Sequence, residues 1–120
     1  MWIDFGGGKK HYMRSAWERN IARYFEFLKQ NGDILEWEYE PQKFIFHKIN
    51  YGNRTYLPDF RITENDGSQH YVEVKGRMDS SSRTKLRRML KYYPKVKIEI
   101  IDIKKYSHIS KLSPVISGWE

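Results

Sequence analysis

The sequence predicts an α/β fold of the α+β type, in which helices flank a central mixed β-sheet. Three observations support this: an early segment with apolar residues at helical spacing, several extended segments in the middle, and a second helical segment followed by an apolar strand. The order helix, strands, helix, strand is typical of a mixed sheet with helices packed on it. A chain of 120 residues is expected to form a single domain over 1–120.

The first eleven residues, 1–11, are expected to be a flexible, basic lead-in, because three consecutive glycines precede Lys9 and Lys10. A helix is then expected from about Tyr12 to Gln30. One face of this helix carries apolar residues at intervals of three and four, namely Trp17, Ile21, Tyr24 and Leu28. Asn31-Gly32 provides the signal that ends the helix.

Extended segments follow. Apolar residues alternate with glutamates from Leu35 to Tyr39, the pattern of a half-buried strand, and another extended piece begins at 44–46. A β-hairpin is expected next, with strands Thr55 to Thr63 and Gln69 to Gly76. Its turn, 64–68, contains the Asn, Asp and Gly residues that tolerate a positive φ.

The C-terminal part begins with a second helix, expected from about Ser82 to Tyr92 and capped by a run of serines. Its apolar positions are Leu86, Met89, Leu90 and Tyr93. A strand from Val96 to Ile100 comes next. The tail, 104–120, has no clear assignment, and Pro114 limits any helix within it.

Strand alternation places two carboxylates of the hairpin on one face. The opposite, apolar face of the first strand would carry Tyr56, Pro58, Phe60 and Ile62. If the turn is centred on Asp66, Phe60 lies opposite Val72 and Asp59 lies opposite Glu73. A two-residue turn would instead put the carboxylates on different faces. The apolar pairing of Phe60 with Val72 favours the first register.

Asp59 and Glu73 would then form a metal site. Directly opposed Cβ atoms lie about 4.5–5.5 Å apart, and two carboxylates at that distance repel unless a cation sits between them. A divalent ion with oxygen ligands meets this need. Lys75 points to the same side, where its ammonium can orient a water or offset charge on a phosphate. The alternative is that Pro58-Asp59 is an ordinary turn dipeptide and that Glu73 and Lys75 lie on a solvated strand face.

Glu18 lies at the edge of the apolar stripe of the first expected helix. A carboxylate in that position can complete a metal site as a third ligand. The alternative is a simple surface pair with Arg14, four residues earlier.

The charge balance points to a polyanionic partner. The chain has 22 Lys and Arg against 15 Asp and Glu, a net charge of +7, and such an excess favours nucleic acid or an anionic membrane. The residues expected to contact phosphates form two groups, one before and within the first helix and one after the hairpin: Lys9, Lys10 and Arg14, with Arg19 and Arg23 nearby, then Arg77, Arg83, Lys85, Arg87, Arg88 and Lys91. The alternative is a solvated helix face.

Other classes of protein and site are disfavoured. No segment approaches the ~20 apolar residues of a membrane span, so a soluble, intracellular protein is expected. There is no cysteine, which excludes disulfides and cysteine-based zinc sites. The four histidines show no metal-ligand spacing.

Glu18, Pro58-Asp59 and Glu73-Val74-Lys75, in this order, resemble the PD-(D/E)XK nuclease superfamily. The runs from Tyr56 to Phe60 and from Tyr71 to Gly76 resemble its phage endonuclease I group of Holliday-junction resolvases. The resemblance implies a restriction-endonuclease-like core in which Asp59, Glu73, the backbone carbonyl of Val74 and Glu18 bind Mg²⁺ or Mn²⁺, while Lys75 assists the attacking water.

The same resemblance implies a homodimer that cuts branched DNA such as a four-way junction. The N-terminal helix could be exchanged between subunits through the segment Gln42 to Asn50. For a phage-encoded chain, the implied location is the cytoplasm of the bacterial host. The alternatives are another nuclease of the superfamily, of the repair, transposition or restriction type, or a DNA-binding module without catalysis.

Overall fold

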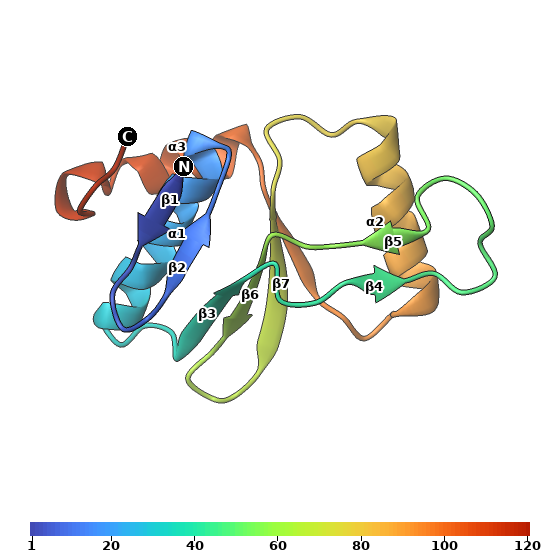
Figure 1. The fold of residues 1–120 in the computed structure, drawn as a ribbon, viewed down its shortest axis with the longest axis horizontal. Helices are drawn as coiled ribbons and strands as arrows, with labels where there is room; N and C mark the ends of the chain where they lie inside the picture. Colours follow the sequence, from blue (N-terminus) through green and yellow to red (C-terminus); the bar gives the residue numbers. More distant parts are fainter.

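The computed structural model describes all 120 residues and is built around a four-stranded sheet (Figure 1). The strands lie in the order β3 (Glu36–Tyr39), β6 (Phe60–Thr63), β7 (Gln69–Val74) and β8 (Ile98–Ile101). The first three are antiparallel, and β8 runs parallel to β7. The sheet is therefore mixed, and with the helices described below it confirms the predicted fold class.

The β6–β7 hairpin has the predicted register. Phe60 lies opposite Val72 and Ile62 lies opposite His70. The turn between the strands is closed by bonds from the Glu64 amide to Ser68 and from the Gly67 amide to Glu64. Gly67 has a φ of 87°, in the region that favours glycine. This turn fixes the pairing of every residue in the two strands.

The first helix starts later than expected because the residues before it are in a hairpin. Strands β1 (Trp2–Asp4) and β2 (Lys10–Tyr12) pair with each other, so the segment expected to be a flexible lead-in is a two-stranded β-hairpin. Helix α1 (Ala16–Gln30) begins after Ser15, whose hydroxyl accepts the amides of residues 17 and 18.

Two hydrophobic clusters occupy opposite sides of the sheet. The first lies under α1 and is formed mainly by Ile21, Phe25, Trp37, Phe60, Ile62 and Val72. The second lies between the sheet, helix α2 (Ser80–Tyr92) and a small pair of strands, β4 (Phe44–Ile45) and β5 (Thr55–Tyr56). It contains Phe44, Phe46, Tyr56, Tyr71 and Met89. Figure 1 shows the two layers of the fold beside the sheet, α1 on one side and α2 with β4 and β5 on the other.

The position of Tyr56 differs from the expectation. Tyr56 was expected on the same face as Phe60, but it belongs to the second cluster, whereas Phe60 belongs to the first. The reason is a break at 57–59: β5 pairs with β4, and only after this break does the chain enter the central sheet as β6. The expected single strand from Thr55 to Thr63 is thus two strands in different sheets.

Helix α2 also begins earlier than expected, and its cap is Asp79 rather than a serine. The Asp79 carboxylate accepts the Ser82 amide at 2.7 Å. Met89 is buried as predicted, but Leu90 is 72% exposed, so it does not belong to the buried face.

The tail contains regular structure where none was assigned. Helix α3 (Ile103–Ser110) is followed by a short 3₁₀ helix (Ser113–Val115) that accommodates Pro114. The tail then returns to α1, where Asn20 is buried and binds the backbone of Glu120. None of the helices is both long and apolar enough to span a membrane.

Candidate active site

Asp59 lies where the chain passes from β5 into β6, just before regular pairing with β7 begins. One of its carboxylate oxygens, Oδ2, accepts the backbone amide of Val74 at 2.8 Å. Its own carbonyl accepts the amide of Glu40 at 2.7 Å. The side chain and the backbone of Asp59 are therefore both fixed, by two different neighbouring strands.

Asp59 and Glu73 lie together, as predicted. Asp59 directly precedes Phe60, the partner of Val72, and its side chain reaches the Val74 amide next to Glu73. The pKa of Asp59 is raised to about 8, first because the group is buried, and then because the carboxylate of Glu73 lies beside it. Without a cation, the pair therefore keeps a proton near neutral pH.

Glu18 approaches this pair from the first turn of α1. The hydroxyl of Tyr39 donates a hydrogen bond to its Oε2 at 2.8 Å. Burial raises the pKa of Glu18, the bond from Tyr39 opposes that shift, and the charges of Asp59 and Glu40 add to it. Glu18 thus lies within the electrostatic field of Asp59, and its role as a third metal ligand stays a prediction.

Glu40 is a carboxylate that sequence reasoning missed. It follows β3 directly, has a left-handed φ of 46° and raises the pKa values of both Asp59 and Glu18. In the sequence it continues the alternation of glutamates from Glu36 onward, which reads as a solvent-facing position. Only the contact of its amide with the Asp59 carbonyl brings it to the site.

These carboxylates provide oxygen ligands without forming a complete cage. No group of three or more acidic or histidine side chains lies close enough to hold a metal ion. However, Mg²⁺ keeps several of its waters and is commonly bound through one or two carboxylates. The Asp59–Glu73 pair, with a proton that a cation would displace, fits such an ion. Val74, whose carbonyl was a predicted ligand, lies directly beside the pair.

Lys75 and Glu73 line a small cleft of about 120 Å³ between the end of β7 and the start of α2. The other lining residues are Tyr56, Leu57, Met78, Ser82, Lys85 and Leu86. Lys75 Nζ lies 3.5 Å from the carboxylate of Asp79, the residue that caps α2. The cap of this helix therefore also orients the ammonium group.

A buried polar atom lies at the same cleft. The hydroxyl of Tyr56 is buried and has no partner at hydrogen-bonding distance. Burial and the charge of Glu73 raise the pKa of this phenol. An unpaired buried hydroxyl is costly, so this atom is suited to bind a water or a substrate oxygen in the cleft.

Some of the predicted phosphate-binding residues bind other groups of the protein, and the others do not. Lys9 is engaged: its ammonium lies 2.6 Å from both a Glu36 carboxylate oxygen and the Trp37 carbonyl. Arg88 is engaged with two backbone carbonyls of the β4–β5 loop. The remaining predicted residues are exposed or partly exposed and make no ion pair: Lys10, Arg14, Arg77, Arg83, Lys85, Arg87 and Lys91. Arg19 and Arg23 both bind the Glu120 carboxylate.

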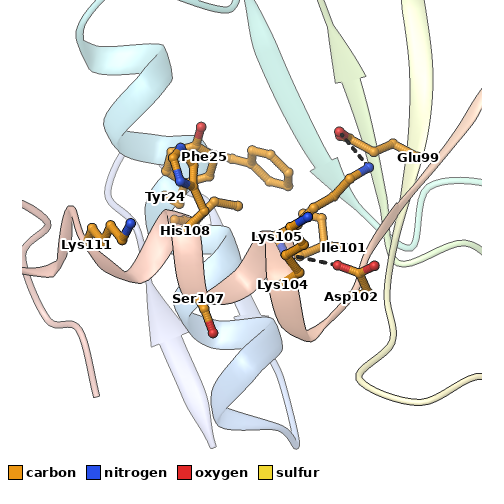
Figure 2. A pocket seen from close by; sticks show the side chains of 11 residues that line it. Tyr24, Phe25, Glu99, Ile101, Asp102, Lys104, Lys105, Ser107, His108 and Lys111 are labelled. Atoms are coloured by element: carbon orange, nitrogen blue, oxygen red, sulfur yellow. Dashed lines mark hydrogen bonds and ion pairs between the residues drawn. The ribbon is translucent and has the colours of Figure 1, made fainter.

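The largest cavity lies elsewhere, between α1, β8 and α3 (Figure 2). It has a volume of about 900 Å³ and an apolar wall that includes Phe25 and Ile101. Lys104, Lys105 and Lys111 lie at its rim, and Lys105 pairs with Glu99 at 3.6 Å. None of the predicted site residues lines it, so it is separate from the carboxylate pair.

Residues 10–108 match the family described as protein of unknown function (DUF1064), and the chain belongs to this family. The matched region contains Glu18, Asp59, Glu73 and Lys75, together with both layers of the fold. A search of curated proteins found no match.

Proposed function

We propose that this protein is a metal-dependent DNA endonuclease that hydrolyses phosphodiester bonds in branched DNA, as a Holliday-junction resolvase does. The observation that carries the proposal is the Asp59–Glu73 pair, fixed at one end of the β6–β7 hairpin with Lys75 in the adjoining cleft. The resemblance of these motifs to the PD-(D/E)XK superfamily supports the same reaction.

The residues have distinct roles in this proposal. Asp59 and Glu73 hold the cation, and Glu18 contributes to the negative field around it. When bound, Mg²⁺ or Mn²⁺ supplies charge stabilisation for the phosphate and lowers the pKa of a bound water. Lys75, oriented by Asp79, donates a hydrogen bond to the attacking water or to a phosphate oxygen.

The exposed basic residues would hold the DNA backbone next to this cleft. Lys85 lines the cleft itself, and Arg83 and Arg87 lie on the same helix. Contacts to phosphates position DNA without reading its sequence, which suits an enzyme that recognises the shape of a junction. A homodimer, which would cut both sides of a junction, belongs to the same proposal.

Exchange of α1 between subunits is not required for the site. Within one chain, α1 packs on the first cluster, and Glu18 binds Tyr39 of the same chain. We therefore propose a dimer in which each subunit contributes its own Glu18.

The test is cleavage of a synthetic four-way junction and of a linear duplex with the same arms, with Mg²⁺, Mn²⁺ or chelator. We expect paired, symmetric cuts in the junction that depend on the metal. Asp59→Asn and Lys75→Ala should each reduce cutting by at least a hundredfold while the protein still binds the junction. Asp33→Asn and Lys111→Ala, at exposed positions away from the cleft, are the matched controls.

A second candidate is a DNA-binding module without catalysis. The observation that favours it is the lack of three acidic side chains close enough to hold a metal. It predicts binding that is insensitive to chelator and no cutting with any divalent metal. Junction that stays uncut while bound would reject the endonuclease.

A further inference from the structure

The loop between β4 and β5 presents the most exposed large hydrophobic side chain of the chain. Tyr51 is 77% exposed at the tip of this loop, which covers residues 46–54. The amide of Phe46 donates to the carbonyl of Arg54 at 2.8 Å and closes the base of the loop. Figure 1 shows the loop extending beyond β4 and β5, beside α2.

The loop is held in one conformation by α2. Arg88 Nη1 donates to the carbonyls of Gly52 at 2.6 Å and Asn53 at 2.8 Å. Ser81 Oγ donates to the Asn53 side-chain oxygen at 2.6 Å. Arg88 of α2 therefore fixes a loop whose tip is an exposed aromatic ring.

The same contacts place the loop beside the candidate active site. Asn53 binds Ser81, and the next residue, Ser82, lines the cleft that also contains Glu73 and Lys75. Tyr51 is two residues from Asn53, a separation of at most ~7 Å between Cα atoms. The loop that carries Tyr51 is therefore fixed beside the first turn of α2, which borders the cleft.

The charge around Tyr51 favours a nucleic acid. The segment 41–58 contains Lys43, Lys48 and Arg54, all exposed, and no acidic residue. None of these three side chains takes part in an ion pair of the chain. Exposed aromatic rings beside basic residues bind bases by stacking, with the basic side chains on the phosphates.

We propose that Tyr51 is a stacking platform for an unstacked base and that it makes the protein prefer branched DNA over continuous duplex. This inference rests on the proposed function and names the feature of the substrate that the site selects. A continuous duplex has no free base face, because each base is stacked on its neighbours, whereas a branch point exposes such a face. Tyrosine is suited to this role because its ring is large and loses little conformational entropy on binding.

The first experiment compares binding of wild type, Tyr51→Ala and Tyr51→Phe to a four-way junction and to a linear duplex, measured by fluorescence anisotropy in chelator. Stacking on one aromatic ring is worth roughly tenfold or more in affinity. We expect Tyr51→Ala to lose about tenfold on the junction and little on the duplex, and Tyr51→Phe to behave as wild type. Trp2→Ala, at another exposed aromatic, is the control and should leave the junction-to-duplex ratio unchanged.

The second experiment tests the role of the fixed loop. Arg88→Ala removes the two bonds that hold the loop, and Arg87→Ala removes the same charge from the adjacent, exposed position. We expect Arg88→Ala to lower the preference for the junction, and Arg87→Ala to weaken both substrates equally and reduce the salt dependence. A 2-aminopurine at the branch point should be quenched by wild type and not by Tyr51→Ala.

The outcomes separate this inference from the endonuclease proposal. If Tyr51→Ala keeps the wild-type ratio of junction to duplex affinity, the inference is overturned even when the enzyme cuts with Mg²⁺. If wild type prefers the junction, Tyr51→Ala loses that preference and wild type cuts no DNA, the inference holds and the endonuclease proposal fails. Equal weakening on both substrates would also overturn the inference, because Tyr51 would then be a general contact.

Discussion

The carboxylate of Asp59 lies beside that of Glu73 at the end of the β6–β7 hairpin, where burial and this neighbouring carboxylate raise the pKa of Asp59 to about 8. A cation bound between the two carboxylates must displace the proton of the pair. The pair therefore links metal binding to pH, to the stability of the metal-free protein and to the pH dependence of cleavage.

Binding of Mg²⁺ should release a proton. At pH 7, below the raised pKa of Asp59, we expect release of about one proton per metal bound, falling toward zero above pH 9. Isothermal titration calorimetry in buffers of different ionisation enthalpy measures this number. Asp59→Asn should bind the metal weakly, and any binding that remains should release no proton. Uptake or release that is independent of pH in wild type would contradict this assignment.

The metal-free protein should become less stable as the pH rises. The native Asp59 holds its proton up to about pH 8, whereas an ordinary aspartate loses it near 3.8. The protonated Asp59 therefore contributes to the free energy of unfolding. This contribution is complete below pH 3.8 and is lost as the pH rises through about 8. Each pKa unit corresponds to about 1.4 kcal/mol, so urea unfolding should show a loss of a few kcal/mol across this window.

Asp59→Asn should remove most of this dependence and raise the melting temperature in chelator at pH 8. The amide can accept the Val74 N–H through its oxygen and donate to Glu73 through its nitrogen, without a charge to bury. Asp33→Asn is the control, because Asp33 is exposed. A lower melting temperature for Asp59→Asn would mean that the carboxylate is stabilising, contrary to this prediction.

Tyr39→Phe should shift the pH profile of cleavage. The Tyr39 hydroxyl donates to Glu18 and lowers its pKa, so its removal leaves the charged form of Glu18 less stable. We expect the acid limb of the profile to move to higher pH, with a several-fold loss of kcat at pH 7. The ring should keep its contact with Phe60. Tyr12→Phe, at an exposed tyrosine, should leave the profile unchanged.

Asn20→Ala should destabilise the protein more than Glu120→Gln does. Asn20 is 1% exposed, and its amide binds Tyr106 and both backbone groups of Glu120. Its loss leaves buried polar groups without partners, at a cost of about 2 kcal/mol or more. The Glu120 side chain pairs with Arg19 and Arg23 near the surface, where solvent screens the charges. Urea unfolding of both variants measures the difference.

The hairpin could be predicted from sequence because local information determines it. The turn residues fix the loop, and the apolar pair of Phe60 and Val72 selects the register, so Asp59 and Glu73 followed without knowledge of the rest of the chain. The same reasoning failed for Tyr56. Strand alternation holds only within one strand, and the break at 57–59 moves Tyr56 to another sheet.

The remaining differences come from contacts between residues far apart in the sequence. The partners of Lys9 are 27 and 28 residues away, and those of Arg88 are 35 and 36 residues away. The sequence shows that Lys9 and Arg88 are basic, but it does not show that both already bind other groups of the protein. Glu40 joins the site through a backbone bond to Asp59, a contact that no side-chain pattern reports.

The division of the core into two clusters has a consequence for inactivation. Glu18 belongs to α1, which packs on the first cluster, whereas Lys75 is oriented by Asp79, the cap of α2, which packs on the second cluster. Loosening either layer disturbs the site while the other layer and the sheet stay folded. In rising urea, cleavage activity should therefore disappear before the circular dichroism signal of the helices does. Loss of activity would then detect partial unfolding of one layer.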